Sequence, residues 1–131
     1  MEINIAISCG ELIDKLTILS IKLEKIKDEN KINNISKEYD SLNEISNSLK
    51  NQDNEKFEKF YVSLKKINLE LWEIEDEIRK FEKDKTFDND FIKLARSVYI
   101  KNDQRFKIKN DINQHFSSEI KEEKEYQDYS D

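Results

Sequence analysis

The sequence contains no proline and only one glycine among its 131 residues. The hairpins and bulges of turn-rich β architectures depend on these two residue types, so their scarcity argues against such folds. It favours long helices instead, because neither residue is there to interrupt them. A chain of this length suits one domain.

Cysteine and long apolar runs are also scarce. Cys9 is the one cysteine, so an internal disulfide is excluded. No apolar run approaches the roughly 18 residues that a membrane-spanning helix needs. The first residues lack the basic region that opens a signal peptide. We therefore expect a cytoplasmic protein.

Positive charge is in deficit. The chain has 23 Lys and Arg against 29 Asp and Glu, a net charge of −6, and a pI near 5.0. Nucleic-acid-binding domains usually show a basic patch or a pI above about 9, and membrane-surface helices carry excess Lys and Arg. We expect neither nucleic acid nor membrane as a partner. Only three residues are arginine, which indicates that their planar guanidinium groups are used: Arg79, Arg96 and Arg105.

Apolar spacing divides the chain into elements. Isoleucines alternate over residues 1–7, which predicts an extended arm. Helical spacing covers residues 8–28, 33–50, 57–81 and 89–116, and polar stretches at 50–54 and 83–90 predict turns. The third helix repeats apolar residues at intervals of three and four, typical of coiled-coil-like packing. We predict an all-α antiparallel four-helix bundle over 8–116, preceded by the arm and followed by a polar acidic tail over 117–131.

The ends of the bundle leave alternatives open. Ser8 and Glu11 form a capping-box pattern, in which each side chain reaches the backbone of the other. The first helix has a second apolar side at Ile18 and Ile21, so it is either central in the bundle or part of a subunit interface. The arm could pair with its symmetry mate in a dimer or lie on the bundle. The tail could be a docked helical turn or a frayed end.

Five polar residues fall inside apolar helix faces. They are Asn68 and Glu75 on the third helix and Asn102, Arg105 and Lys109 on the fourth. A buried charge must be paired or bound to a ligand. No acidic residue lies three or four positions from Arg105, so Glu75 is the best-placed partner across the bundle. Lys109 adds a second cation, which could leave this layer net positive and open to an anion.

Two interpretations of this layer remain open. In one, it is a structural polar layer that fixes the register of the helices, which is the more frequent role of such groups. In the other, the five residues bind a small anionic ligand such as a sugar precursor, since bundle sites are built from inward-facing side chains.

A second set of residues indicates an interface. Ile18 and Ile21 of the first helix, with Ile92, Arg96 and Ile100 on the outer side of the fourth, combine apolar surface with charge. We expect them to bind a protein partner or a second copy in a homodimer. Scattered surface isoleucines are the alternative. Arg79 follows Glu75 by four residues, which predicts an ordinary helical ion pair.

Catalytic chemistry finds little support. Cys9 stands at a helix start, where a thiol is activated, but nothing ties the single histidine, His115, to it. The count of Cys and His excludes a zinc site built on these residue types. Glu73 and Asp76 match only half of the acidic pattern of all-helical nucleotide pyrophosphatases. We expect no catalytic residue, no metal site and no cofactor.

Several blocks of the sequence resemble one family, DUF6165. These blocks cover most of the chain outside the second helix. They are Ile7–Lys22, Asn68–Arg79, Phe91–Arg105 and Glu122–Tyr126. The family has no established activity, so the resemblance implies no catalytic residue. It implies a setting in surface-polysaccharide biosynthesis, where we expect an accessory, non-enzymatic interaction module.

Overall fold

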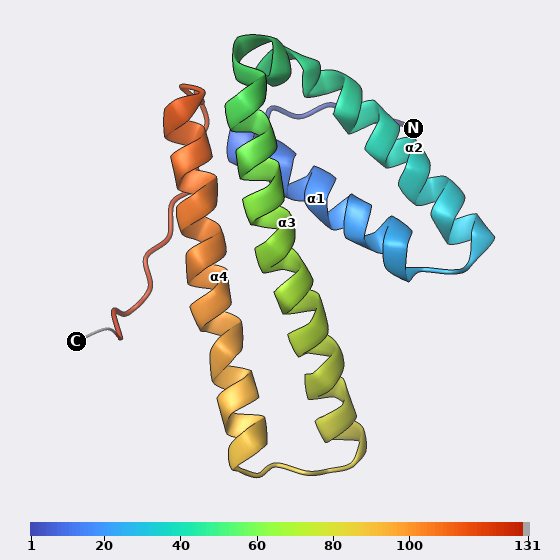
Figure 1. The fold of residues 1–131 in the computed structure, drawn as a ribbon, viewed down its shortest axis with the longest axis vertical. Helices are drawn as coiled ribbons and strands as arrows, with labels where there is room; N and C mark the ends of the chain where they lie inside the picture. Colours follow the sequence, from blue (N-terminus) through green and yellow to red (C-terminus); the bar gives the residue numbers. More distant parts are fainter. Residues whose placement is uncertain (130–131) are drawn as a thin grey trace.

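In a computed structural model, residues 1–129 are described, and they form four helices and no strand. The helices are α1 (Cys9–Lys25), α2 (Glu29–Ile45), α3 (Asn47–Lys83) and α4 (Asn89–His115). They form two antiparallel hairpins, α1–α2 and α3–α4, and the first hairpin packs against one end of the longer second one (Figure 1). The predicted antiparallel helical bundle is confirmed.

Short polar side chains begin three of the helices. The side chain of Ser8 accepts a hydrogen bond from the backbone N–H of Glu11 at 3.1 Å. Asp28 and Asp88 cap α2 and α4 in the same way. The predicted capping box is therefore half formed, because the carboxylate of Glu11 pairs with Lys109 of α4 instead of reaching back to Ser8.

The boundary between α2 and α3 differs from the prediction. The second helix ends at Ile45, and Ser46 follows it in a buried position before α3 begins. The polar stretch 50–54, predicted as a turn, lies within α3, where Asp53 leaves helical geometry at φ −160° and ψ 88°. Asp53 bends the helix and caps its continuation by accepting from the N–H of Lys56 at 3.1 Å. The cap residue, rather than the polarity of the whole stretch, sets the local structure.

The core lies where α1 meets the other three helices, so α1 is central, one of its two predicted positions. Its leucine stripe packs against apolar residues of α3, α4 and the start of the C-terminal segment. The buried cluster consists of Leu12, Ile13, Leu16, Leu49, Phe57, Leu64, Ile112 and Phe116. None of the helices within residues 1–129 is both long enough and apolar enough to cross a bilayer.

The start of α1 lies directly against the end of α4. The backbone N–H of Gly10 donates to the side-chain oxygen of Asn113 at 2.7 Å, and that of Cys9 donates to the Ser118 hydroxyl at 3.1 Å. A Cβ atom on residue 10 would lie 2.6 Å from the backbone oxygen of Lys109. Only glycine permits this approach of the two backbones.

The half of the α3–α4 hairpin that is distal to the core has no further helix packed on it (Figure 1). Every buried residue of α3 lies at or before Asn68, and every buried residue of α4 lies at or after Lys109. Beyond these points the facing apolar side chains are only half-buried: Leu71, Ile74, Ile78, Phe81, Phe91, Leu94 and Val98. Two helices alone leave their seam partly open to solvent.

The two ends of the chain behave differently. Residues 1–7 form the predicted extended arm, with no strand partner among the described residues. Ser117, at φ 54°, ends α4, and the chain then runs back along it without helical structure. The described part of the tail is thus docked, but as an extended segment and not as a helical turn. Residues 130 and 131 of the predicted tail lie outside the described part.

Substitution of Gly10 tests the close contact between α1 and α4. Helix propensity alone would make Gly10→Ala stabilising by roughly 1 kcal/mol. The added methyl group collides with a backbone oxygen that cannot rotate away, and overpacking of this kind costs about 1–3 kcal/mol. We expect a net loss of stability in urea unfolding followed by circular dichroism, and a larger loss for Gly10→Val. A Gly10→Ala protein more stable than wild type would contradict the contact.

Candidate functional site

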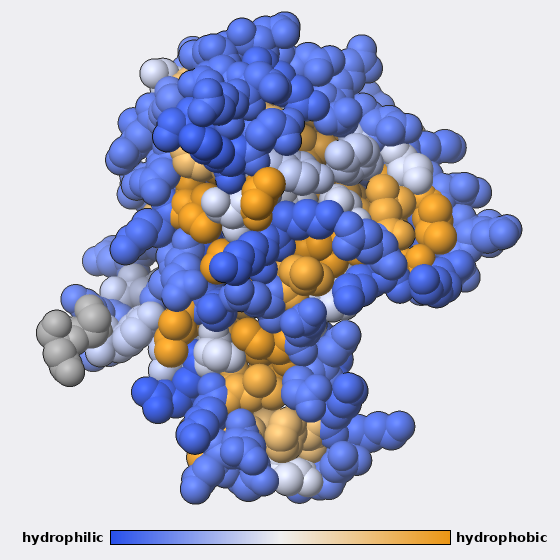
Figure 2. Space-filling model, viewed as in Figure 1, coloured by the Kyte–Doolittle hydropathy of each residue, from blue (hydrophilic) through white to orange (hydrophobic). Residues whose placement is uncertain are grey.

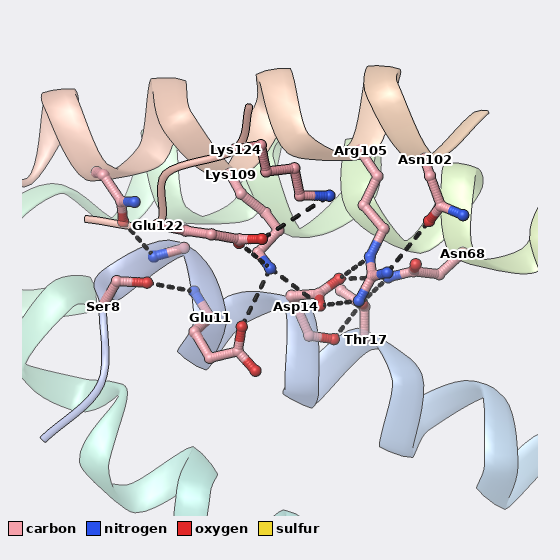
Figure 3. A network of polar contacts seen from close by, with 12 residues as sticks. Ser8, Glu11, Asp14, Thr17, Asn68, Asn102, Arg105, Lys109, Glu122 and Lys124 are labelled. Carbon is pink, nitrogen blue, oxygen red and sulfur yellow. Dashed lines mark hydrogen bonds and ion pairs between the residues drawn. The ribbon is translucent and has the colours of Figure 1, made fainter. Parts of the chain in front are cut away.

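A buried carboxylate on α1 organises the polar residues of the bundle. Asp14 is 1% exposed and faces α3 and α4 (Figure 3). An ionised carboxylate in this position is stable only when it is paired and hydrogen-bonded. Four residues from the three helices surround it: Thr17, Asn68, Arg105 and Lys109.

Arg105 is the main partner of Asp14. Its Nε donates to Oδ1 at 3.0 Å and its Nη2 donates to Oδ2, a two-point contact that uses the planar guanidinium. The remaining Nη1 donates to the side-chain oxygen of Asn102 at 3.3 Å. The hydrogen bonds to Asp14 raise the pKa of Arg105 despite its partial burial. The side chain of Arg105 is 28% exposed, so it lies at the edge of the interior.

Asn68 and Thr17 complete the contacts of Asp14. The amide Nδ2 of Asn68 donates to Asp14 Oδ1 at 2.8 Å and to the Thr17 hydroxyl at 2.9 Å. That hydroxyl donates to the backbone oxygen of Asp14 at 2.7 Å. The predicted inward position of Asn68 is confirmed by its burial. The network joins α1, α3 and α4 through side chains that are each satisfied.

Lys109 belongs to a second group of charges beside this network. Its Nζ lies 3.0 Å from Glu11 Oε2 and 2.7 Å from Glu122 Oε2, and 3.9 Å from Asp14 Oδ2. Burial alone would lower the pKa of Lys109, but the hydrogen bonds to Glu122 and Glu11 outweigh it and raise the pKa. The net positive layer that the sequence left open is therefore absent here. Three carboxylates balance the three cations of the group, the third cation being Lys124, whose Nζ lies 3.8 Å from Glu122 Oε1.

The C-terminal segment holds this group in place from outside. After Glu122 contacts Lys109, the ammonium of Lys124 lies 5.2 Å from the centre of the Phe106 ring. Farther on, the Tyr129 hydroxyl donates to Asp103 Oδ2 at 2.6 Å. These contacts follow α4 backwards turn by turn, so the segment covers one side of the helix.

The predicted pairing of Arg105 with Glu75 is wrong. Glu75 accepts from Arg79 at 3.0 Å, which confirms the predicted ion pair within α3, and Arg105 pairs with Asp14. The position of Asp14 in the sequence indicates that it can be a partner of Arg105. Asp14 precedes Ile18 and Ile21 by four and seven residues, which places a carboxylate inside the second apolar face of α1.

A groove of about 530 Å³ opens beside the network, between the second half of α1 and the α3–α4 hairpin. Figure 2 shows apolar side chains exposed in this angle and along the distal part of the hairpin. Four apolar side chains line the groove together with the polar residues of its rim: Ile18, Ile21, Leu71 and Trp72, with Asn68, Glu75, Asp76, Arg79, Asn102 and Arg105. Four of the five predicted ligand-binding residues thus share one groove, and Lys109 lies outside it.

The structure separates the residues predicted as an interface. Ile18 and Ile21 line the groove, and Ile21 is 1% exposed because α1 is packed on both sides. Ile100 is exposed beside the C-terminal segment, in a hollow that also contains Asp103 and Tyr126. The residues predicted as one interface therefore lie in two places, with the half-buried Ile18 in the groove and Ile100 beside the C-terminal segment.

The residues considered for catalysis are not brought together. His115 Nε2 lies 2.9 Å from Asp53 Oδ2 at the bend of α3, and this contact helps the Lys56 backbone hydrogen bond to lower the pKa of Asp53. Cys9 contacts the C-terminal segment through its backbone. Within residues 1–129, no group of three or more His, Cys, Asp and Glu side chains is arranged to hold a metal ion.

Four helices around a buried ion-pair network, with an open groove beside it, define a small helical-bundle domain. The chain belongs to DUF6165, a family of unknown function whose model matches residues 3–130. This match confirms the family that the sequence resembles. Comparisons with curated proteins and with solved structures find no match.

A double-mutant cycle tests the Asp14–Arg105 pair. Arg105→Ala removes the two-point contact of a nearly fully buried carboxylate and leaves it the more distant Lys109 ammonium at 3.9 Å. Breaking a buried pair costs about 3–5 kcal/mol. Asp14→Ala should cost less, because Arg105 is partly exposed and can turn to water. The double variant should lose less than the sum of the two, by roughly 0.5–3 kcal/mol in urea unfolding.

The exposed Lys65–Glu24 pair, which also joins α3 to α1, is the matched control, and Lys65→Ala should cost at most about 1 kcal/mol. Additive effects would refute a coupled pair.

The tail contact predicts an alkaline transition. Donation of the Tyr129 hydroxyl to Asp103 raises its pKa from 10.0 to about 12. A raised pKa means that this contact is fully present below pH 10 and is lost as the pH rises towards 12. Burial raises the pKa of Tyr39 to about 12 as well, so the late-ionising ultraviolet absorbance should fall by one tyrosinate, and not vanish, in Tyr129→Phe. In Asp103→Asn the same tyrosine should ionise earlier, and an unchanged titration would argue against the docked segment.

Proposed function

We propose that this protein is a non-enzymatic interaction module that binds an amphipathic helix of a partner protein in the groove beside Trp72. The observation that carries the proposal is the uncovered distal half of the α3–α4 hairpin, whose apolar seam runs into the groove. A helix seated there would supply the third member that this half of the hairpin lacks.

The apolar lining favours a helix. Ile18, Leu71 and Trp72 are spaced along two helices that border the groove, which suits the side chains at i, i+3, i+4 and i+7 of a bound helix. Tryptophan is among the residues that contribute most to binding energy at interfaces, where it becomes fully shielded from water in the complex. Trp72 is half-buried and is the only tryptophan of the chain.

The charges of the groove favour a basic partner over an anion. Asp14 neutralises Arg105 and Glu75 neutralises Arg79, which leaves Asp76 without an ion pair among the described residues. An anionic sugar precursor would have to displace one of these carboxylates. A helix with an apolar stripe and a lysine or arginine facing Asp76 meets no such cost. The surface-polysaccharide setting implied by the family resemblance is the pathway in which we place this partner.

Fluorescence of Trp72 tests the proposal directly. A synthetic amphipathic helix of leucine and lysine should shift the emission to shorter wavelength in a saturable manner, because the indole becomes shielded from water. A helix of leucine and glutamate should bind much more weakly. Ile18→Gln should weaken binding of the lysine helix by about tenfold or more. Val62→Gln removes an exposed apolar residue of α3 outside the groove and is the matched control.

Two results would contradict the proposal. Equal effects of Ile18→Gln and Val62→Gln would show that the helix does not bind in the groove. A saturable emission shift with sugar phosphates or sugar nucleotides, abolished by Arg105→Lys, would assign the groove to an anionic ligand. Circular dichroism of each variant establishes that the helices are retained.

A further inference from the structure

The N-terminal arm is an extended segment without partners. Residues 1–7 make no hydrogen bond, backbone or side chain, to any other described residue. Ile3 and Ile5 are 75% and 76% exposed, while Ile7 packs against the core and anchors the arm to α1. The arm therefore presents both its peptide groups and its isoleucines to solvent.

An unpaired extended segment of this kind is a template for a second strand. Its free N–H and C=O groups can form a ladder with another chain, and its β-branched side chains suit a pleated surface. Alternation places Met1, Ile3, Ile5 and Ile7 on one face and Glu2, Asn4 and Ala6 on the other.

We propose that the arms of two copies of this chain pair as antiparallel strands about a two-fold axis at Asn4. In this register Ile3 of one copy lies opposite Ile5 of the other, and Asn4 lies opposite Asn4. Glu2, the only charged side chain of the arm, lies opposite Ala6, so no like charges meet. One face of the two-stranded ribbon is then entirely apolar, and the arrangement is self-complementary, as a two-fold interface requires.

The hollow beside the arm accommodates the second strand. A hollow of about 680 Å³ separates the arm from α2, and Leu42 and Ile45 of α2 contribute apolar surface to it. Ile45 is exposed in the single chain and would be covered by the ribbon. Lys15 and Lys37 also line the hollow, together with Glu2 and Glu38, and neither lysine forms an ion pair within residues 1–129. The hollow therefore has no excess of negative charge to oppose the added strand.

Disulfide cross-linking tests the register. In a Cys9→Ser background, Asn4→Cys places two thiols across the two-fold axis, where Cα atoms of antiparallel strands lie roughly 4.5–5.5 Å apart. Disulfides require about 4.4–6.8 Å, so a covalent dimer should form rapidly on mild oxidation. Ile3→Cys and Ile5→Cys chains should cross-link with each other faster than either does with itself, because positions 3 and 5 lie directly opposite whereas identical positions lie on a diagonal roughly 7–8 Å apart. Equal rates for all pairs would overturn the register.

Mass in solution tests the association itself. Light scattering should give twice the 15.8 kDa mass of the chain for the wild type. The double variant Ile3→Lys/Ile5→Lys should be a monomer with unchanged helical circular dichroism. Ile92→Lys, an exposed isoleucine on α4, is the matched control and should remain a dimer. Ile18→Gln should also remain a dimer, which separates this proposal from the groove. A wild-type monomer at all concentrations, or a dimer unaffected by the arm variant, would refute arm pairing.

Discussion

The carboxylate of Asp14 is the group on which the arrangement of the helices depends. Because it is buried within α1, it requires hydrogen bonds and a counter-charge, and these come from Asn68 of α3 and Arg105 of α4. Apolar stripes alone would tolerate several helix registers of similar packing. A two-point guanidinium contact and an amide contact on the same carboxylate admit one arrangement of the three helices. We therefore infer that the main role of this network is to fix the register of the helices, and that its contribution to the free energy of unfolding is secondary.

The same end of the bundle is fixed a second time by backbone contacts. Gly10 allows the start of α1 to meet the end of α4, where Asn113 and Ser118 accept from its first N–H groups. These donors are consequently unavailable to an anion, although helix starts often bind one. Lys109 is held by Glu11 and Glu122 just beside this contact. Hydrogen bonds and charges are thus largely satisfied at this end of the bundle, where the start of α1 meets the end of α4. We therefore look for a binding surface elsewhere in the molecule.

The helices, the Ser8 cap and the inward position of Asn68 could be predicted from sequence, because spacing and capping are local properties of the chain. The partner of Arg105 could not be assigned from the fourth helix alone, since it depends on which face of which helix lies opposite. Asp14 was recognisable only as a carboxylate within the second apolar face of α1. The sequence also fails to predict the end of α2 at Ile45. The stretch 50–54 is more polar than the single-residue junction at Ser46, so the turn is expected there. Contacts distant in sequence therefore limit prediction of the site more than secondary structure does.

The tightly packed end of the bundle, where α1 meets the end of α4, and the open groove beside Trp72 have the same structural cause. α1 and α2 are shorter than α3 and α4, and the Asp14 network together with Gly10 anchors α1 at the end of the hairpin that contains Lys109. Beyond Asn68 no other helix covers the apolar seam between α3 and α4, so the seam stays half-buried. α1 diverges from the hairpin along its length and ends at Lys25, where the chain turns into α2, so α1 leaves the distal seam uncovered (Figure 1). This apolar seam, beside the only tryptophan of the chain, is the surface on which the proposed partner helix rests.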